Sequence, residues 1–242
     1  GPGALRDAVD AAARRHGLRF AVDPSSGAFC TMGGMAAANA AGARSVKLGA
    51  TRAWVRGLDC VFADGTRAWV RRGEPQPKVE ALRAFNAEVS RDAMERGAKL
   101  AHAGVRKESS GYALADYARS GDLVDILVGS EGTLAVFVGI DLGLAPLPAA
   151  SVSLLASFPT LEGAVQAAAR AAELGAAAVE LLDRTFLDVM RAEAASLAIP
   201  AATEAVLLIE AEGGTHAETD TLALRLAYAC RAACAAQLVA AP

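Results

Sequence analysis

The sequence predicts an α+β protein built from two parts of different character. Residues 1–148 contain a hairpin signal at Asp64-Gly65 and one alternating strand, whereas short apolar runs alternate with helical stretches after Pro148. The 242 residues are 53% hydrophobic and 5% aromatic, which is enough chain for one large or two small domains. Because alanine supplies much of the apolar content, we expect cores of small side chains. This composition excludes collagen-like, disordered and disulfide-rich proteins.

Charge and hydropathy exclude further classes. A net charge of −3 argues against nucleic acid as the main partner, because such surfaces usually need a basic excess. No apolar run of about 20 residues is free of charges or turn residues, so no transmembrane helix is predicted. The start lacks the pattern of a signal peptide. We therefore expect a soluble, cytoplasmic protein, with attachment at a membrane periphery as the other location. Four cysteines without metal-site spacing are expected to be reduced: Cys30, Cys60, Cys230 and Cys234.

Four elements are expected in the first part from apolar spacing. They are a helix over 5–13 ended by Gly17, a short strand over 18–22, a hairpin of strands 58–63 and 66–70, and a polar helical region over 79–100. Asp64-Gly65 predicts a primed turn in the hairpin. A further strand over 134–142 is expected to bury its even-numbered positions, from Leu134 to Leu142. Residues 28–51 show no usable period.

The second part shows regular alternation of strands and helices after the stiff Pro146-Leu147-Pro148 linker. The expected strands cover 152–158, 178–182 and 206–210, and the expected helices cover 161–174, 186–190 and 216–236. Helices that connect successive strands favour a small sandwich with the helices on one face of the sheet. Such a sandwich needs a further strand and helix, so we expect this layer to be incomplete and both ends of the chain to be cut.

Two loops have the composition of ligand-binding segments. Cys30 to Gly42 consists largely of glycine and alanine, so a flat ligand or its phosphates could approach the backbone N–H groups. Asn39 offers a donor and an acceptor and tolerates left-handed geometry. The alternative for this segment is a tight helix of small residues packed on a sheet. In Gly129 to Leu134, the charged Glu131 could bond a ligand or cap a neighbouring backbone.

Taken in order, these segments resemble the FAD-binding domain of FAD-linked oxidases, the p-cresol methylhydroxylase/vanillyl-alcohol oxidase superfamily. The resemblance is to the branch of D-lactate dehydrogenase, glycolate oxidase and D-2-hydroxyglutarate dehydrogenase. The motifs that carry it are Asp23–Ser26, Thr31–Gly34, Asn39–Gly42, Arg44–Gly49, Thr51-Arg52, Gly57–Gly65, Lys107–Tyr112 and Leu127–Leu134. The resemblance implies an α+β fold in which residues 1–148 form the C-terminal half of a PCMH-type FAD-binding domain. Residues 149–242 would begin a ferredoxin-like α+β cap domain.

The resemblance also implies a cofactor, FAD, and a set of contact residues. Thr31, Gly33 and Gly34 would lie along the flavin and its ribityl or pyrophosphate chain, with Asn39 and Gly42 close by. Pro24 and Ser25 would shape the loop that leads into this contact. The adenosine end would be lined by Glu131, Gly132, Ala135 and Val136. The parent protein would oxidise a small 2-hydroxy acid, such as D-lactate, glycolate or D-2-hydroxyglutarate, by hydride transfer to the flavin, and would pass the electrons to an acceptor.

The sequence departs from the family at Leu48, Glu108 and Ala41. It also contains neither the family's R-G-G-G-x-S loop, which grips the pyrophosphate, nor its H-G-G-type motif, which binds metal or substrate. The three histidines, His16, His102 and His216, stand outside such a motif, so neither a metal site nor a catalytic base is assigned. We therefore expect a fragment that binds FAD weakly or not at all. Two alternatives are a non-catalytic α+β ligand- or protein-binding module and the flavin part of a larger flavin/iron–sulfur fusion dehydrogenase.

Overall fold

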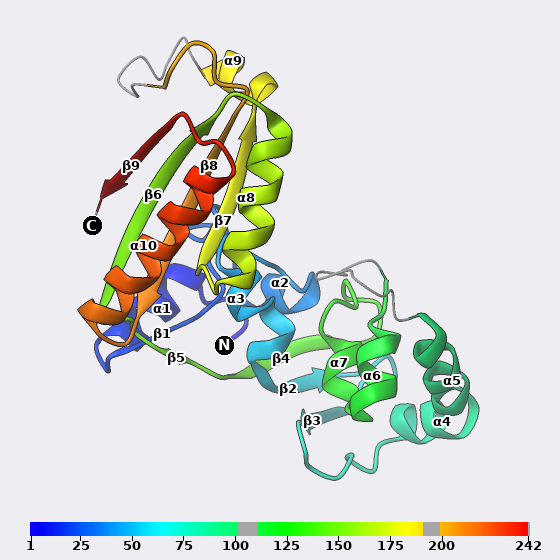
Figure 1. Cartoon of the computed structure of the whole chain (residues 1–242). Coiled ribbons are helices and arrows are strands. Elements are labelled where there is room, and N and C mark those ends of the chain that lie inside the picture. Colours follow the sequence, from blue (N-terminus) through cyan, green and yellow to red (C-terminus); the bar gives the residue numbers. More distant parts are fainter. Residues whose placement is uncertain (101–110, 191–198, 242) are drawn as a thin grey trace. The chain divides into compact units, whose positions relative to one another are not determined.

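A computed structural model describes residues 1–100, 111–190 and 199–241 (Figure 1). The chain divides into two compact units. Unit 1 comprises Gly1–Gly42 and Gly49–Pro146, and unit 2 comprises Ala43–Leu48 and Leu147–Pro242. Both units mix helices and strands, so the predicted α+β class is confirmed.

Unit 1 contains a three-stranded antiparallel sheet in the order β3-β2-β4 and a two-stranded sheet, β1-β5. Its strands are β1 (Leu18–Arg19), β2 (Val55–Val61), β3 (Arg67–Arg71), β4 (Val136–Leu142) and β5 (Ala145–Pro146). Its helices are α1 (Arg6–Arg14), α2 (Met32–Ala37), the 3₁₀ turn η1 (Thr51–Trp54), α4 (Glu80–Glu88), α5 (Ser90–Leu100), α6 (Leu114–Ser120) and α7 (Leu123–Leu127). The predicted first helix and the hairpin are therefore present.

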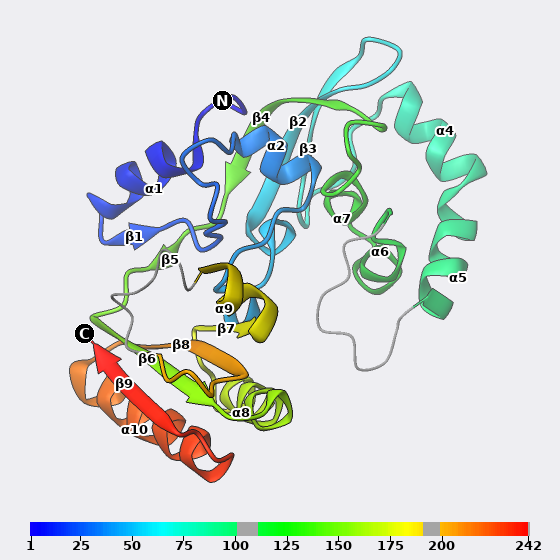
Figure 2. The ribbon, with the colours of Figure 1, turned by 90° about the horizontal axis from the view of Figure 1, so that it is seen from above.

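The main core of unit 1 lies between one face of the β3-β2-β4 sheet and helices α4 to α7. Leu58, Cys60 and Val70 from the sheet join Val124 and Leu127 from α7 in one buried cluster. Burial raises the pKa of the Cys60 thiol to about 12, with a smaller contribution from the charge of Asp59. Helices α5 and α6 lie side by side at the outer edge of this layer (Figures 1 and 2).

The turn of the hairpin differs from the predicted primed turn. Gly65 has a φ of 80°, but Asp64 is not among the residues with positive φ, which a type I′ turn requires at both central positions. Instead, Phe62 N–H donates to Thr66 O and Gly65 N–H donates to Phe62 O. This is a three-residue loop that closes on a left-handed glycine, and Asp64 Oδ1 accepts from Thr66 N–H within it.

The predicted even-numbered core face of β4 is wrong for the first half of the strand. Val136 and Val138 are 63% and 38% exposed, while Phe137 is buried. The register shifts from Asp59↔Gly139 to Cys60↔Phe137, so Val138 is an extra residue on β4. Because a bulge reverses the alternation of side chains, the positions on either side of it bury opposite parities.

Three other expectations about unit 1 need correction. The helical region over 79–100 divides at Val89, whose φ of −123° and ψ of −34° are not helical, into α4 and α5. The expected strand over 18–22 keeps only two paired residues, although Phe20 and Val22 are buried with Met32 and Met35. Helices α6 and α7 were not predicted.

Unit 2 is a four-stranded antiparallel sheet in the order β7-β8-β6-β9, with α8 and α10 on one face (Figures 1 and 2). Its elements are α3 (Ser45–Leu48), β6 (Ala150–Phe158), α8 (Leu161–Glu173), β7 (Ala178–Asp183), α9 (Arg184–Met190), β8 (Ala205–Gly213), α10 (His216–Ala232) and β9 (Gln237–Ala241). This strand order and the connecting helices are those of a ferredoxin-like βαββαβ layer. The expectation that its last strand would be absent was wrong, because α10 ends at Ala232 and Gln237 opens β9.

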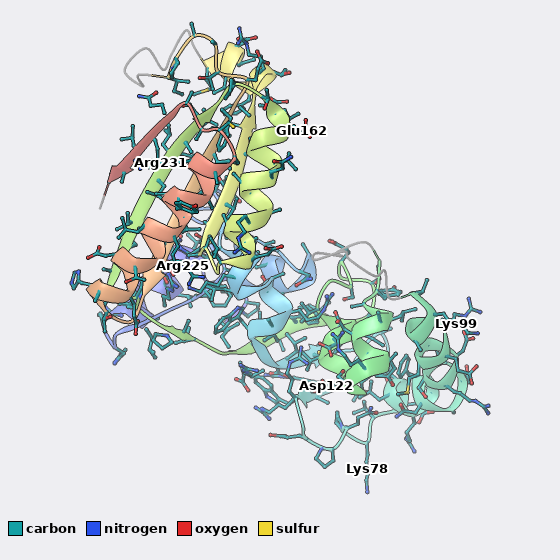
Figure 3. The ribbon with its side chains drawn as sticks, in the orientation of Figure 1. Lys78, Lys99, Asp122, Glu162, Arg225 and Arg231 are labelled. Atoms are coloured by element: carbon teal, nitrogen blue, oxygen red, sulfur yellow. The ribbon has the colours of Figure 1, made fainter. Side chains whose placement is uncertain are left out.

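Small side chains fill the core of unit 2, as the composition predicted. Ala164, Ala167 and Ala171 of α8 are completely buried in a cluster that includes Leu154 and Phe158 of β6. Charged side chains such as Glu162, Arg225 and Arg231 are exposed on α8 and α10 (Figure 3). The segment Ala43–Leu48 belongs to this unit, and its Arg44 pairs with Glu210 at 2.6 Å and Glu212 at 2.9 Å on β8.

Candidate functional site

A compact turn that includes two of the predicted site residues precedes the first glycine-rich loop. Pro24 O accepts a hydrogen bond from Gly27 N–H at 2.9 Å, and Ser25 is exposed at the top of this turn. Ser26 Oγ lies 3.1 Å from Cys30 Sγ. The hydrogen bond between Gly27 and Pro24 therefore closes a turn just ahead of the loop.

The segment 32–37, which showed no period in the sequence, forms the short helix α2. Thr31 caps it, because its Oγ1 accepts a hydrogen bond from Gly34 N–H at 3.2 Å. Gly33 N–H donates to Pro2 O at 2.7 Å, and Met32 N–H donates to Ala4 O at 2.9 Å. The first amides of α2 are thus already bonded within unit 1, so a ligand at Gly33 and Gly34 would meet bare backbone surface and not free donors.

The end of this first loop is held in a left-handed bend. Asn39 has a φ of 47°, is only 4% exposed, and its Oδ1 accepts a hydrogen bond from Arg52 N–H at 2.9 Å. Ala40 O accepts from both Thr51 N–H and Thr51 Oγ1. A Cβ on Gly42 would lie 2.3 Å from the carbonyl carbon of Asp23. Gly42 therefore permits close packing of the chain on itself, which accounts for this glycine without a ligand.

The second loop, 129–133, lies directly against the end of α2. Gly129 N–H donates to Ala36 O at 2.9 Å, and Glu131 N–H donates to Ala37 O at 3.0 Å. Glu131 has a φ of 53°, and Gly132 has one of 76°. The backbone of Glu131 therefore bonds the neighbouring loop, while its side chain and Gly132 are exposed.

The two predicted residues after this loop separate in space. Ala135 is 7% exposed and belongs to the main core, whereas Val136 is 63% exposed on the outer face of β4. Ala135 directly precedes β4, where consecutive side chains point to opposite faces, so these two cannot both line one surface through their side chains. Together the two loops bring Thr31, Gly33, Gly34, Asn39, Glu131 and Gly132 into one region of unit 1.

Three residues of this region were not assigned a role from sequence. Ser130 is 1% exposed, and its Oγ has no hydrogen-bond partner among the described residues. Thr133 Oγ1 donates to Ser130 O at 2.6 Å and lies 2.7 Å from Tyr112 Oη. All three lie inside segments that resemble the family, Ser130 and Thr133 in Leu127–Leu134 and Tyr112 in Lys107–Tyr112. The Tyr112 contact joins residues that are far apart in the chain.

Part of the predicted set lies outside the described residues. This applies to His102 and to Lys107–Ser110 with the Glu108 departure. Across residues 1–100, 111–190 and 199–241, no group of three His, Cys, Asp or Glu side chains could hold a metal ion. No helix in the same ranges is long and apolar enough to cross a membrane.

The sequence matches two family models. Residues 1–71 match one described as an FAD binding domain, and residues 147–242 match one described as the C-terminal domain of FAD linked oxidases. The chain is 31% identical over 214 residues to glycolate oxidase subunit GlcD of Bacillus subtilis, which covers 88% of this chain and 37% of that protein. It is 31% identical over 219 residues to D-lactate dehydrogenase of Archaeoglobus fulgidus, covering 90% of this chain and 40% of that one.

A third relative is D-2-hydroxyglutarate dehydrogenase of Xanthomonas citri pv. viticola, 32% identical over 160 residues, or 66% of this chain and 25% of that protein. The chain thus spans less than half the length of these three relatives. A solved structure of alkyldihydroxyacetonephosphate synthase matches with a TM-score of 0.64 at 18% identity, covering 98% of this chain and 38% of that one. At this identity the likeness shows the fold alone.

Proposed function

Because the chain belongs to the FAD-linked oxidase family, we propose that it is part of a FAD-dependent dehydrogenase or oxidase that acts on a small 2-hydroxy acid. The three relatives at 31% and 32% identity are named for glycolate, D-lactate and D-2-hydroxyglutarate, so these three acids are the first substrates to test. Residues 1–148 would be the second half of the FAD-binding domain, and residues 149–242 would be the N-terminal part of the cap domain.

FAD is the cofactor of this family, and two features of unit 1 fit such a ligand. Ser130 Oγ is a buried polar atom without a partner among the described residues, and burying such a group alone is unfavourable. The second loop, which carries this atom, lies against the first loop of glycine and alanine, where little side-chain bulk would obstruct a flat ligand. This convergence of the two loops is the observation that carries the proposal.

When bound, FAD would supply the redox chemistry by accepting a hydride at N5 from the carbon that bears the hydroxyl group. In this proposal the residues of this chain bind the cofactor and orient it. Ser130, Glu131 and Gly132 would hold one end of the cofactor, and Thr31, Gly33 and Gly34 would lie along the other. No residue of the chain is proposed as the base.

The chain by itself should bind FAD weakly or not at all. The amides at the start of α2 are already bonded to Pro2 and Ala4, so unit 1 offers few free donors there for a pyrophosphate. A titration followed by flavin fluorescence, together with gel filtration, tests this expectation. Purified chain that is yellow and keeps stoichiometric flavin through the column would contradict it.

Enzyme activity is tested on the longest reading frame that contains this chain. We expect a flavoprotein whose bound flavin is bleached by the D-isomer of lactate or 2-hydroxyglutarate, or by glycolate, and which reduces a dye acceptor. Ser130→Ala is the test variant, and Ser90→Ala at the start of α5, which lies outside both loops, is the control. A full-length protein that binds no flavin would favour a non-catalytic binding module. The same conclusion would follow if none of the three acids bleached its flavin. Iron–sulfur absorption in the same protein would identify the larger fusion dehydrogenase.

A further inference from the structure

Arg52 occupies the point of unit 1 where the two glycine-rich loops meet. It lies in η1, and its side chain is only 11% exposed. Its backbone N–H is the donor to Asn39 Oδ1, so it holds the left-handed bend of the first loop. The same residue can therefore act on the first loop through its backbone and on other segments through its side chain.

The guanidinium group of Arg52 bonds the stretch that leads into the second loop. Nη2 donates to Val128 O at 2.8 Å, and Nε donates to Asp125 O at 3.1 Å. Carbonyls at the end of a helix lack intrahelical partners, and Gly129 N–H, the amide that could bond Asp125 O, donates instead to Ala36 O. The guanidinium thus provides hydrogen bonds to the carbonyls at the C-terminal end of α7. The Gly129 amide is then available for its hydrogen bond to Ala36 O, which joins the two loops.

Packing at this point is as close as a glycine permits. A Cβ on Gly129 would lie 2.9 Å from Arg52 Nη2 and 3.3 Å from Asn39 Cβ. Gly129 also has a φ of 88°, which side chains rarely adopt. One residue from each loop and the guanidinium therefore meet at a single contact.

The buried charge of Arg52 is balanced within unit 1. Burial lowers the pKa of Arg52, and nearby Arg72 adds to this, while Asp116 and Asp125 oppose both. Nη1 lies 3.2 Å from Asp116 Oδ2, and Arg72 Nη2 lies 2.6 Å from Asp125 Oδ1. Arg72 pairs with Asp122 and Asp125, of which Asp125 also acts on Arg52, and its Nη2 donates to Arg52 O at 3.1 Å. Among the described residues Arg72 bonds neither glycine-rich loop, so it serves as the control.

We propose that Arg52 is a positioning residue that holds the loops 31–42 and 129–133 in a fixed position relative to each other, so that cofactor binding depends on its guanidinium. It acts through Asn39 and Gly129. The dependence on cofactor rests on the proposed function, whereas the effect on the loops does not. A lysine would keep the charge but cannot bond two carbonyls and a carboxylate from one planar group.

The test compares Arg52→Lys with Arg72→Lys in the 242-residue chain without FAD. Circular dichroism reports whether each variant folds, and hydrogen exchange reports the Gly129 and Glu131 amides. We expect these two amides to exchange at least about tenfold faster in Arg52→Lys and within about twofold of wild type in Arg72→Lys. Unchanged exchange in Arg52→Lys, or an equal rise in both variants, overturns the proposal.

A second variant covers the case in which Arg52→Lys does not fold. Asn39→Gly removes the acceptor for Arg52 N–H and tolerates the left-handed backbone at this position. It should also speed the exchange of the Gly129 and Glu131 amides, and normal protection there would overturn the proposal.

The cofactor arm is measured separately, on the longest reading frame that contains the chain. Arg52→Lys should weaken FAD binding at least about tenfold and Arg72→Lys less than about threefold. If the unmodified protein binds no FAD, the proposed function fails. The exchange result alone then still decides whether Arg52 holds the two loops in position. Normal FAD affinity in Arg52→Lys would overturn the link to the cofactor.

Discussion

The two units of the chain are stabilised in different ways. In unit 1, buried polar side chains and left-handed residues join segments that are distant in sequence, as Asn39, Arg52 and Asp125 illustrate. Unit 2 is one sheet covered by two helices, with alanines between them and Thr160 and Thr215 as helix caps. The first arrangement depends on a few specific contacts, whereas the second depends on a pattern that repeats along each element. The candidate site lies in the first kind of structure, where local strain and function often coincide.

The comparison predicts that a single methyl group at a contact between loops will strongly destabilise unit 1. Gly42→Ala would place a Cβ 2.3 Å from the Asp23 carbonyl carbon and 2.4 Å from its oxygen. Because both atoms are backbone, we expect a loss of about 3 kcal/mol, the upper end of the usual cost of overpacking. Hydrogen exchange in urea, read from peptides of unit 1 and of unit 2, measures the loss.

Gly3→Ala is the control for this substitution, since no atom lies within 4 Å of a Cβ there. It should change neither unit. If Gly42→Ala leaves unit 1 as stable as the control does, close packing between loops is not what distinguishes that unit.

In unit 2 the corresponding weak point is the alanine interface of α8. Ala167 is completely buried against the sheet, so Ala167→Leu must push α8 outward and should cost unit 2 about 2 kcal/mol. Ala169→Leu, on the exposed side of the same helix, is the matched control. Urea unfolding monitored by exchange of unit 2 peptides gives both values, and equal values would show that the small-residue core is not tightly packed.

The same difference decides how much could be predicted from sequence. Among the described residues of unit 2, the helices and strands other than α3 and β9 lie near their predicted places, because periodic apolar positions specify such a layer. The short α3 and the strand β9 were not predicted. In unit 1 the bulge at Val138 reversed a correct strand pattern, and α6 and α7 gave no usable signal. The loops of the candidate site were found by motif, but the contact of Arg52 with Val128 joins residues 76 apart, which no local pattern reveals.

Helix caps should matter less than the core in unit 2. Thr215 Oγ1 accepts a hydrogen bond from Glu218 N–H at 3.2 Å, and Glu218 Oε2 accepts one from Gly214 N–H at 3.0 Å, so Thr215 opens a capping arrangement. Thr215→Ala should lower the free energy of unfolding of unit 2 by about 1 kcal/mol. Thr221→Ala, in the exposed middle of α10, is the control. A loss confined to Thr221→Ala would exclude the capping role.

The smallest effect concerns an ion pair in unit 1 and appears only with pH. The hydrogen bonds from Arg67, at 2.6 Å for the shortest, lower the pKa of Asp59 although burial opposes them. A carboxyl group whose folded-state pKa lies below its unfolded value of about 3.9 stabilises the fold above that pH. Its contribution is lost as the pH falls through the folded-state pKa. Arg67 is 66% exposed, so solvent screens the pair and the effect should be below that of the Thr215 cap.

Arg67→Gln tests this ion pair by removing the cation while keeping a long polar side chain. We expect unit 1 of the variant to be less stable than wild type at pH 7, and the two to converge as the pH falls below about 3.9, because a protonated Asp59 gains nothing from Arg67. Arg83→Gln, whose partner Glu80 is exposed, should show almost no difference at either pH. Unit 2 should not respond to Arg67→Gln at any pH. A gap between wild type and Arg67→Gln that stays constant into acid would mean that Arg67 stabilises β3 by packing along the sheet and not by its charge.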